Sequence, residues 1–262
     1  MFVSTRCRPN VKKVDGRVPG LAGCGVMQTT LAQYNETQST DSFTLQNSKL
    51  LKVRLDQVTI QAKLGSMVAY QGNVSFEHAG SGGLGRMLKK AVTGEGQSLM
   101  KMTGTGEVFL ADTAQDIHLI YLEGEKITVN GPNLLAFDAG IDWDIERVQG
   151  ASGVMGGGLY NTALQGTGWV AILSDGPPVL LNVASAPTFA DAQAVVTWSG
   201  GVQTSMKTDF KMKDLIGKGS GDQLQMAFSG QGWVLVQPSE GRIQGATEQT
   251  RSGGGLGSLL NG

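Results

Sequence analysis

The chain has 262 residues, of which 40% are apolar, 16% are charged and 39 are glycine. Its 21 basic and 22 acidic side chains leave a net charge of −1, which argues against a polycationic nucleic-acid binder and against a protein held to anionic lipid by bulk charge. Two cysteines and two histidines are too few for a Cys/His zinc site or a disulfide scaffold, and we expect no cofactor.

Residues 1–40 differ in composition from the rest of the chain. They are basic, are interrupted by Pro9 and Pro19, and lack both hydrophobic periodicity and the apolar core of a secretory signal. Both cysteines, Cys7 and Cys24, fall here. We interpret residues 1–40 as a basic, disordered leader together with the segment that leads into the fold. Because Met27 is an alternative translation start, the sequence leaves open whether residues 1–26 belong to the native protein.

A glycine-framed strand pattern then recurs three times. Two glycines separated by one residue precede a run of strand-forming residues at Gly104, Gly166 and Gly230, in steps of 62 and 64 residues. An aromatic residue precedes each glycine pair by 34, 29 and 32 residues, at Tyr70, Phe137 and Trp198. Two markers that keep the same order and nearly the same phase predict three copies of one unit.

Each unit is predicted to be β-structure. Short segments of β-branched and aliphatic residues alternate with turn formers such as Asn130-Gly131-Pro132, and helix is expected only at 84–91 and 211–216. A unit of about 62 residues makes a small sandwich with exposed edges, which three units around one axis would cover. We predict an all-β fold of three such sandwiches around a pseudo-threefold axis, with one or two short helices. The units span 41–113, 114–175 and 176–241, and a glycine-rich flexible tail spans 242–262.

Four phrases in this order resemble a known family: Leu45–Val53, Gly65–Gly72, Thr93–Gly96 and Phe228–Pro238. The family is widespread in bacteria, archaea and eukaryotes, was long described as a domain of unknown function, and has eukaryotic members named for altered inheritance of mitochondria. The resemblance covers about residues 28–240. It implies a TRAP-like fold, a short double-stranded β-helix related to that of the tryptophan RNA-binding attenuation protein and duplicated within the chain. It implies no reaction, and it links eukaryotic relatives to organisation of the mitochondrial inner membrane.

Candidate sites for chemistry are weak. Asp142, Asp144 and Glu146 alternate with apolar residues, so a strand would put the three carboxylates on one face, and clustered carboxylates are ligands for a hard cation. Carboxylates spaced about 7 Å apart along a strand do not converge on one ion, so we expect a solvated face. Gly80–Gly85 has the spacing G-x-G-x-x-G but no βαβ context, which favours a flexible connector.

Catalytic constellations are also missing from the sequence. His78 and His118 are the only imidazoles and form no His-x-His pair, so neither metal-cupin chemistry nor an activated nucleophile is indicated, and we expect no enzyme. The four tryptophans are expected to cap the core, since three of them occupy repeat positions: Trp143, Trp169, Trp198 and Trp233.

The best surface for a partner is the basic amphipathic helix expected at 84–91, through Arg86, Met87, Lys89 and Lys90. Such a helix suits a protein groove or a membrane interface. The favoured function is a non-enzymatic β scaffold that presents surfaces to a protein partner or to itself. We expect a cytoplasmic protein, with membrane association left open, because no run approaches about 18 apolar residues. The alternative is a small-ligand or RNA sensor with a polar pocket between units and a basic rim, although the near-neutral charge counts against nucleic acid.

Overall fold

The structure is a computed structural model that describes residues 30–79, 98–147, 160–206 and 225–239. Nearly all of the regular structure in these ranges is β, which confirms the predicted class. The strands are β1 (Phe43–Asn47), β2 (Leu50–Lys63), β3 (Met67–Ala79), β4 (Leu99–Leu110), β5 (Asp116–Asn130), β6 (Leu134–Asp138), β7 (Asp142–Arg147), β8 (Tyr160–Ser174), β9 (Val179–Asn182), β10 (Thr188–Asp191), β11 (Val195–Ser199), β12 (Val202–Met206), β13 (Gln225–Gly230) and β14 (Trp233–Val236).

Helical structure is confined, in the described ranges, to three short 3-10 segments. These are η1 (Leu31–Tyr34), η2 (Gly131–Asn133) and η3 (Val183–Ser185). The helices predicted at 84–91 and 211–216 lie outside the described residues.

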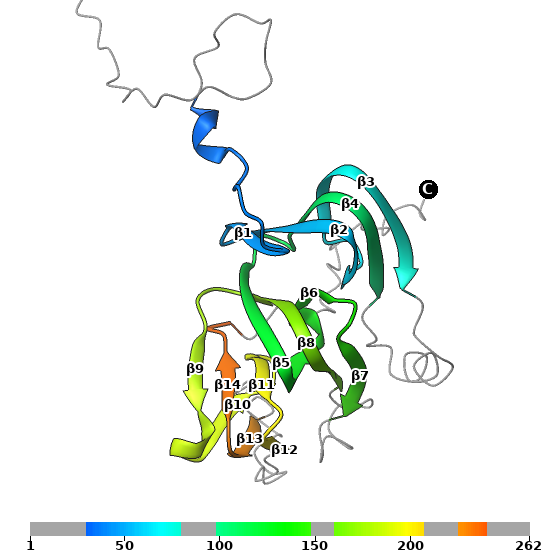
Figure 1. Cartoon of the computed structure of the whole chain (residues 1–262). Helices are drawn as coiled ribbons and strands as arrows, with labels where there is room; N and C mark the ends of the chain where they lie inside the picture. Colours follow the sequence, from blue (N-terminus) through cyan, green and yellow to red (C-terminus); the bar gives the residue numbers. More distant parts are fainter. Residues whose placement is uncertain (1–29, 80–97, 148–159, 207–224, 240–262) are drawn as a thin grey trace, which may run out of the picture.

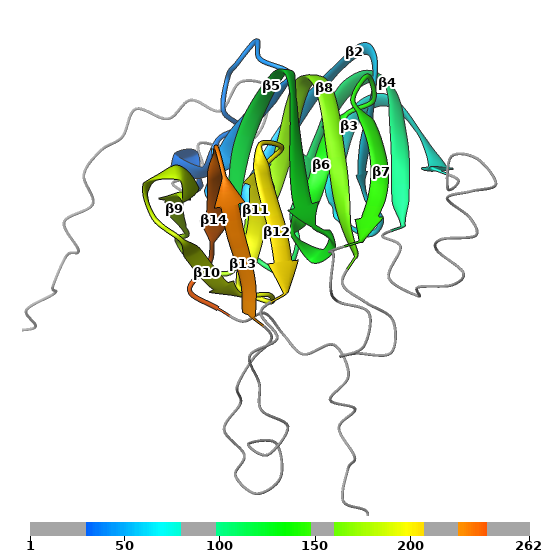
Figure 2. The same ribbon diagram turned by 90° about the horizontal axis from the view of Figure 1, so that it is seen from below.

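The strands form two antiparallel sheets. The large sheet runs in the order β3-β4-β2-β6-β8-β5-β11-β14-β9, with β1 added beside β2 and β7 beside β8, and the small sheet runs β10-β13-β12. Figure 1 shows β3 and β9, the two ends of the large sheet, on opposite sides of the molecule, and Figure 2 shows the same separation from below.

One pattern of strand pairing recurs in three stretches of the chain: the last strand of each stretch lies between earlier strands. Within 43–110, β4 lies between β2 and β3, and within 116–174, β8 lies between β5 and the pair β6 and β7. Within 179–236, β14 lies between β9 and β11 while β13 lies between β10 and β12. We call these stretches the first, second and third segments. Their pseudo-threefold arrangement stays a prediction.

Two short ladders join the segments. The end of β2 pairs with β6, where Gln61 lies opposite Phe137, and the end of β5 pairs with β11, where Thr128 lies opposite Trp198. In both junctions, the first long strand of one segment meets the strand of the next segment that carries the repeated aromatic residue.

Glycine allows the central strands to bend while they remain paired. Gly104 on β4 has φ +143°, and a Cβ there would lie 2.1 Å from the carbonyl oxygen of Asn73 on β3. The bend brings the rings of Tyr70 and Phe76 within 5.0 Å, centroid to centroid, although six residues of straight strand span about 20 Å. Figure 1 shows β3 and β4 arching together.

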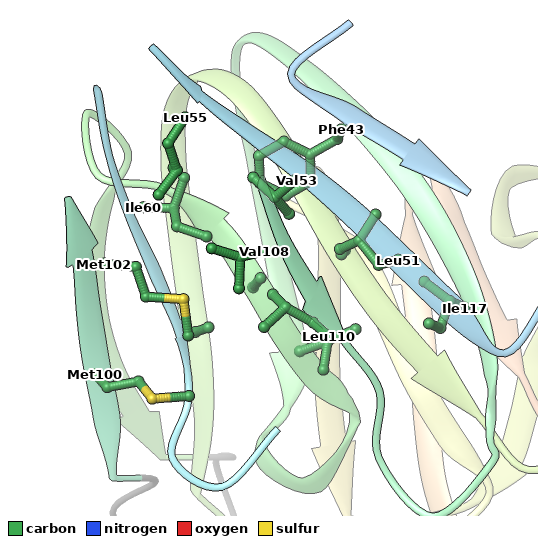
Figure 3. Close-up of a cluster of buried hydrophobic side chains, with 14 of the residues drawn as sticks. Phe43, Leu51, Val53, Leu55, Ile60, Met100, Met102, Val108, Leu110 and Ile117 are labelled. Atoms are coloured by element: carbon green, nitrogen blue, oxygen red, sulfur yellow. The ribbon is translucent and has the colours of Figure 1, made fainter. Parts of the chain in front are cut away.

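The core consists of three apolar clusters. The first lies under β2 and β4 and includes Leu135, Ala136 and Leu173 of the second segment (Figure 3). The second lies within the second segment and takes Leu99 from β4 and Val196 from β11. The third contains only residues of the third segment. Each tryptophan lies in or against a cluster, as predicted: Trp169 against the first, Trp143 and Trp233 against the second, and Trp198 in the third.

We expect Gly104→Ala to lower the free energy of unfolding by about 2–4 kcal/mol, because the new methyl group would displace the backbone of β3. Urea denaturation measures the change. The matched control is Gly140→Ala, which has no heavy atom within 4 Å of its Cβ position and is expected to leave stability nearly unchanged. Equal effects of the two substitutions would contradict the role assigned to Gly104.

Candidate functional site

A buried lysine organises the first segment. Leu51 and Val53 face the core on β2, so Lys52 between them faces the other way, yet only 3% of its side chain is exposed. Residues 35–37 cross over this face and cover it. The ammonium group donates to a carboxylate oxygen of Glu36, to Oε1 of Glu107 at 2.8 Å and to the carbonyl oxygen of Thr37 at 2.9 Å.

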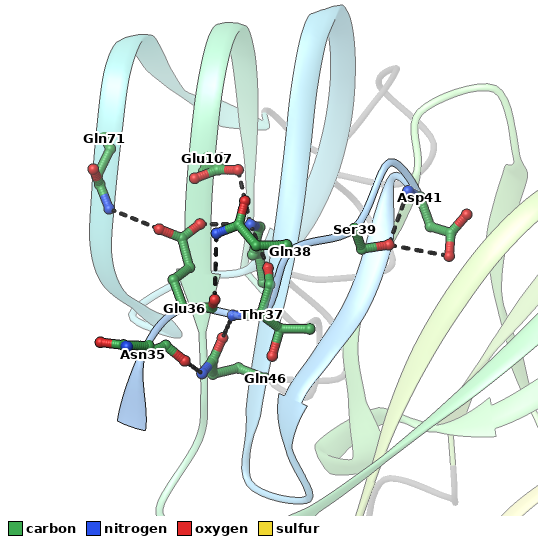
Figure 4. A network of polar contacts seen from close by, with 10 residues as sticks. Asn35, Glu36, Thr37, Gln38, Ser39, Asp41, Gln46, Gln71 and Glu107 are labelled. Atoms are coloured by element: carbon green, nitrogen blue, oxygen red, sulfur yellow. Dashed lines mark hydrogen bonds and ion pairs between the residues drawn. The ribbon is translucent and has the colours of Figure 1, made fainter. Parts of the chain in front are cut away.

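Further polar contacts hold the covering strip in place (Figure 4). Gln46 on β1 accepts a hydrogen bond from the Thr37 amide at 2.7 Å and donates to the carbonyl oxygen of Asn35 at 3.0 Å. Glu36 also lies 3.5 Å from the side-chain amide of Gln71 on β3. The sequence analysis placed residues 35–37 in the leader and entry segment, 1–40. The strip therefore ties the beginning of the described chain to β1, β2, β3 and β4.

The ionised forms of Glu36 and Lys52 are favoured in this network. Hydrogen bonds with Glu107 and Lys52 hold the pKa of Glu36 below its ordinary value, against burial, which raises it. Burial lowers the pKa of Lys52, but hydrogen bonds with Glu107 and Glu36 outweigh that effect and raise it overall. The contribution of Lys52 to stability is therefore lost only above its ordinary pKa of 10.5. That of Glu36 is lost only as the pH falls from 4.5 through its lowered pKa.

A polar pocket lies where the second and third segments meet. Its volume is about 120 Å³, smaller than the roughly 300–1,000 Å³ of a typical ligand site. Lys126 and Glu146 form an ion pair of 2.7 Å in its lining, and the Trp198 ring packs edge-on against Phe228. The remaining lining residues are Thr128, Asn161, Gly200, Val202 and Thr204. The sensor hypothesis expects a polar pocket between units, but this lining holds one cation and one anion rather than a basic rim.

The predicted carboxylate row lies on β7 with the expected alternation. Asp142, Asp144 and Glu146 are exposed, while the residues between them are half-buried. Glu146 pairs with Lys126, and Oδ1 of Asp144 accepts the amide of Ile145 at 2.8 Å. Within the described ranges, no three His, Cys, Asp or Glu side chains are grouped so that they would hold a metal ion.

Other predicted features lie outside the described residues. They are the partner surface of Arg86, Met87, Lys89 and Lys90, the glycine motif Gly80–Gly85, the cysteines Cys7 and Cys24, and the tail 242–262. Their roles, including contact with a membrane, stay predictions.

His118 serves a structural hydrogen bond. Its Nε2 lies 2.8 Å from Oγ of Ser174, and that hydroxyl donates to the carbonyl oxygen of Gly176 at 2.7 Å. Because the hydroxyl proton is used, Nε2 of the imidazole carries a proton and donates. Burial lowers the pKa of His118, against the nearby charge of Asp116, which raises it, and so favours the neutral ring.

The sequence analysis missed a repeated backbone cap beside the glycine pairs. Oδ2 of Asp138 accepts the Trp169 amide at 2.7 Å, and Oγ of Ser199 accepts the Trp233 amide at 3.0 Å. Burial raises the pKa of Asp138, although the bond from Trp169 lowers it. The signal is visible in the sequence as an aromatic residue followed by a short polar one, opposite Gly-x-Gly-Trp.

We expect Lys52→Met to lower the free energy of unfolding at pH 7 by about 2–4 kcal/mol, because the carboxylates of Glu36 and Glu107 are left facing each other. Denaturation at pH 7 and pH 4 measures it. The loss is smaller at pH 4, because in the variant Lys52 no longer holds Glu36 ionised and proton uptake by Glu36 relieves the repulsion. Lys49→Met is the control, since it removes an ion pair with Asp116 whose lysine is 44% exposed, and stability should hardly change. An equal loss at both pH values would contradict the electrostatic explanation.

In the described part of the chain, no helix is long and apolar enough to cross a membrane. No curated protein sequence matches this chain. The X-ray structure of protein SPYM3_0169 from Streptococcus pyogenes is similar in fold, with a TM-score of 0.62 and 21% sequence identity, covering 75% of this chain and 92% of that one.

The sequence pattern of one family, Mitochondrial biogenesis AIM24, matches residues 43–239. This range begins at the first residue of β1 and ends three residues after β14, so it takes in all the strands described above. The match also agrees with the resemblance carried by the four phrases of the sequence. The chain belongs to the AIM24 family of mitochondrial biogenesis.

Proposed function

We propose that this protein is a non-enzymatic β scaffold that binds another polypeptide chain through the terminal strands of its large sheet. The observation that carries the proposal is the location of exposed apolar side chains. Val68, Tyr70 and Phe76 lie on β3 at one end of the sheet, and Val179 and Leu180 lie on β9 at the other. Apolar residues gathered on sheet edges are typical of surfaces that another chain covers.

The contacts made by the titratable side chains also support a non-enzymatic scaffold. Lys52 holds the strip at residues 35–37, Lys63 pairs with Asp112 at 2.6 Å, and His118 is bonded to Ser174. Each of these titratable groups makes a contact that stabilises the fold. We further propose that the three segments are sister modules of a TRAP-like fold related by a pseudo-threefold axis, in support of which the order of strands recurs in each.

A photocrosslink tests the scaffold. With p-benzoylphenylalanine in place of Tyr70, we expect irradiation of cells to give an adduct with another polypeptide chain, seen as a shift on a denaturing gel and identified by mass spectrometry. The matched control is the same residue in place of Tyr121, since both tyrosines are 48% exposed but Tyr121 lies on an interior strand of the sheet. No adduct from position 70, or equal adducts from both positions, would contradict the proposal.

A second candidate function is the binding of a small zwitterion in the pocket between the second and third segments, favoured by the Lys126–Glu146 pair in its lining. We expect one of a panel of free amino acids to raise the thermal midpoint of the protein in proportion to the logarithm of its concentration. Lys126→Met should abolish the shift, whereas Lys49→Met should keep it. A panel without effect on the wild-type protein would rule this candidate out.

A further inference from the structure

In the part of the chain that the structure describes, the outer edge of β3 has no paired strand. β3 pairs with β4 from Met67 opposite Leu110 to Ala79 opposite Leu99, and within the described ranges it pairs with no other strand. Its counterparts in the later segments are paired on both sides: β6 with β8 and β2, and β11 with β14 and β5. In the described part of the chain, β3 therefore lacks the second neighbouring strand that β6 and β11 have.

The exposed fraction of the repeated aromatic residue differs between the segments. Phe137 is fully buried and Trp198 is 5% exposed, because each lies in a junction ladder opposite a strand of the preceding segment. Tyr70 occupies the same place on β3 and is 48% exposed. A strand laid along the edge of β3 would give Tyr70 the cover that its counterparts have.

β3 lacks most of the features that protect an edge strand from pairing. Protein edge strands are commonly protected by lysine, by proline, by shortness or by a β-bulge. The irregularity in the β3 ladder is confined to its start, between Met67 and Ala69. β3 has 13 residues, no lysine, arginine or proline, and a single carboxylate side chain, that of Glu77. β9, at the other end of the sheet, has four residues and follows Pro177 and Pro178. Of the two terminal strands of the large sheet, β3 is therefore the better suited to pair with a further strand.

The backbone of β3 also has groups available. The carbonyl oxygens of Gln71 and Asn73 point to β4, since each lies 2.1 Å from the Cβ position of a β4 glycine. Backbone groups alternate in direction along a strand, so Tyr70, Gly72 and Val74 direct their N–H and C=O groups to the outer edge.

We propose that β3 pairs antiparallel with β3 of a second copy of this chain, forming a symmetric dimer with one continuous sheet. This inference rests on the proposed scaffold function and names its partner. A contact of a surface with itself closes after two copies, as in most homodimers. Antiparallel pairing centred on Gly72 keeps the outward-directed residues opposite one another, with Tyr70 of one copy facing Val74 of the other. It places Glu77 opposite Met67, so the two carboxylates lie far apart.

Light scattering on the purified full chain tests the dimer. We expect a mass of twice 27.5 kDa and, in the variant that combines Val68→Lys and Tyr70→Lys, a dissociation constant raised at least tenfold. The control is Leu180→Lys, because Leu180 is 61% exposed and Val68 is 59% exposed, and this variant should stay dimeric. Both sites are on the surface, and an unchanged circular dichroism spectrum verifies that the variants fold.

A second measurement needs no variant. Hydrogen exchange of the wild-type chain is compared above and below the dissociation constant, and the amides of Tyr70, Gly72 and Val74 should be protected only in the dimer. A wild-type chain that stays monomeric at every concentration would overturn the proposal, as would a dimer in which these amides exchange freely.

Mixing distinguishes the symmetric dimer from a head-to-tail contact. A tagged wild-type chain should not capture the double lysine variant, because both partners need an intact β3. Capture would show that β3 binds a different strand of the second copy and would overturn the symmetric pairing. A monomeric wild-type chain that still crosslinks from position 70 to another protein would overturn the dimer and leave the scaffold function standing. A monomeric wild-type chain that also gives no crosslink from position 70 would overturn both the dimer and the scaffold function.

Discussion

The structure depends on how closely two backbones can approach at the glycine pairs. At Gly104 the carbonyl oxygen of the neighbouring strand occupies the place that a side chain would need. This contact lets a long strand turn sharply without losing its hydrogen-bonded partner, so one pair of strands covers two sides of a core. Without it, β3 and β4 would run straight, and the apolar cluster beneath them would be open to water.

The bends also decide where polar groups gather. A bent central strand leaves the amide after Gly168 or Gly232 without its ladder partner, and Asp138 or Ser199 supplies the acceptor. Between the second and third segments, the strands separate enough to leave a pocket beside Trp198. The two caps thus accompany the bends at the glycine pairs, and the ion pair of Lys126 and Glu146 lines the pocket at the junction of the segments.

Much of the fold could be predicted from the sequence, because the glycine pairs and the repeated aromatic residues are local signals with a fixed period. The burial of Lys52 could not, since β2 alone would leave that side chain in water, and a separate strip at residues 35–37 covers it. The open edge of β3 was also hidden. Tyr70, Phe137 and Trp198 look equivalent in the sequence, and only the strand order reveals that, among the described strands, none pairs with the outer edge beside Tyr70.

The third apolar cluster has a consequence for the order of unfolding. Its buried members run from Val183 to Val234 and include no residue of the other segments, whereas the first cluster interleaves side chains of two segments. A unit with its own core can open as one cooperative subdomain. Opening of the third segment would leave the first cluster intact, but it would withdraw Val196, Trp233 and Leu235 from the second cluster and so uncover part of the core of the second segment.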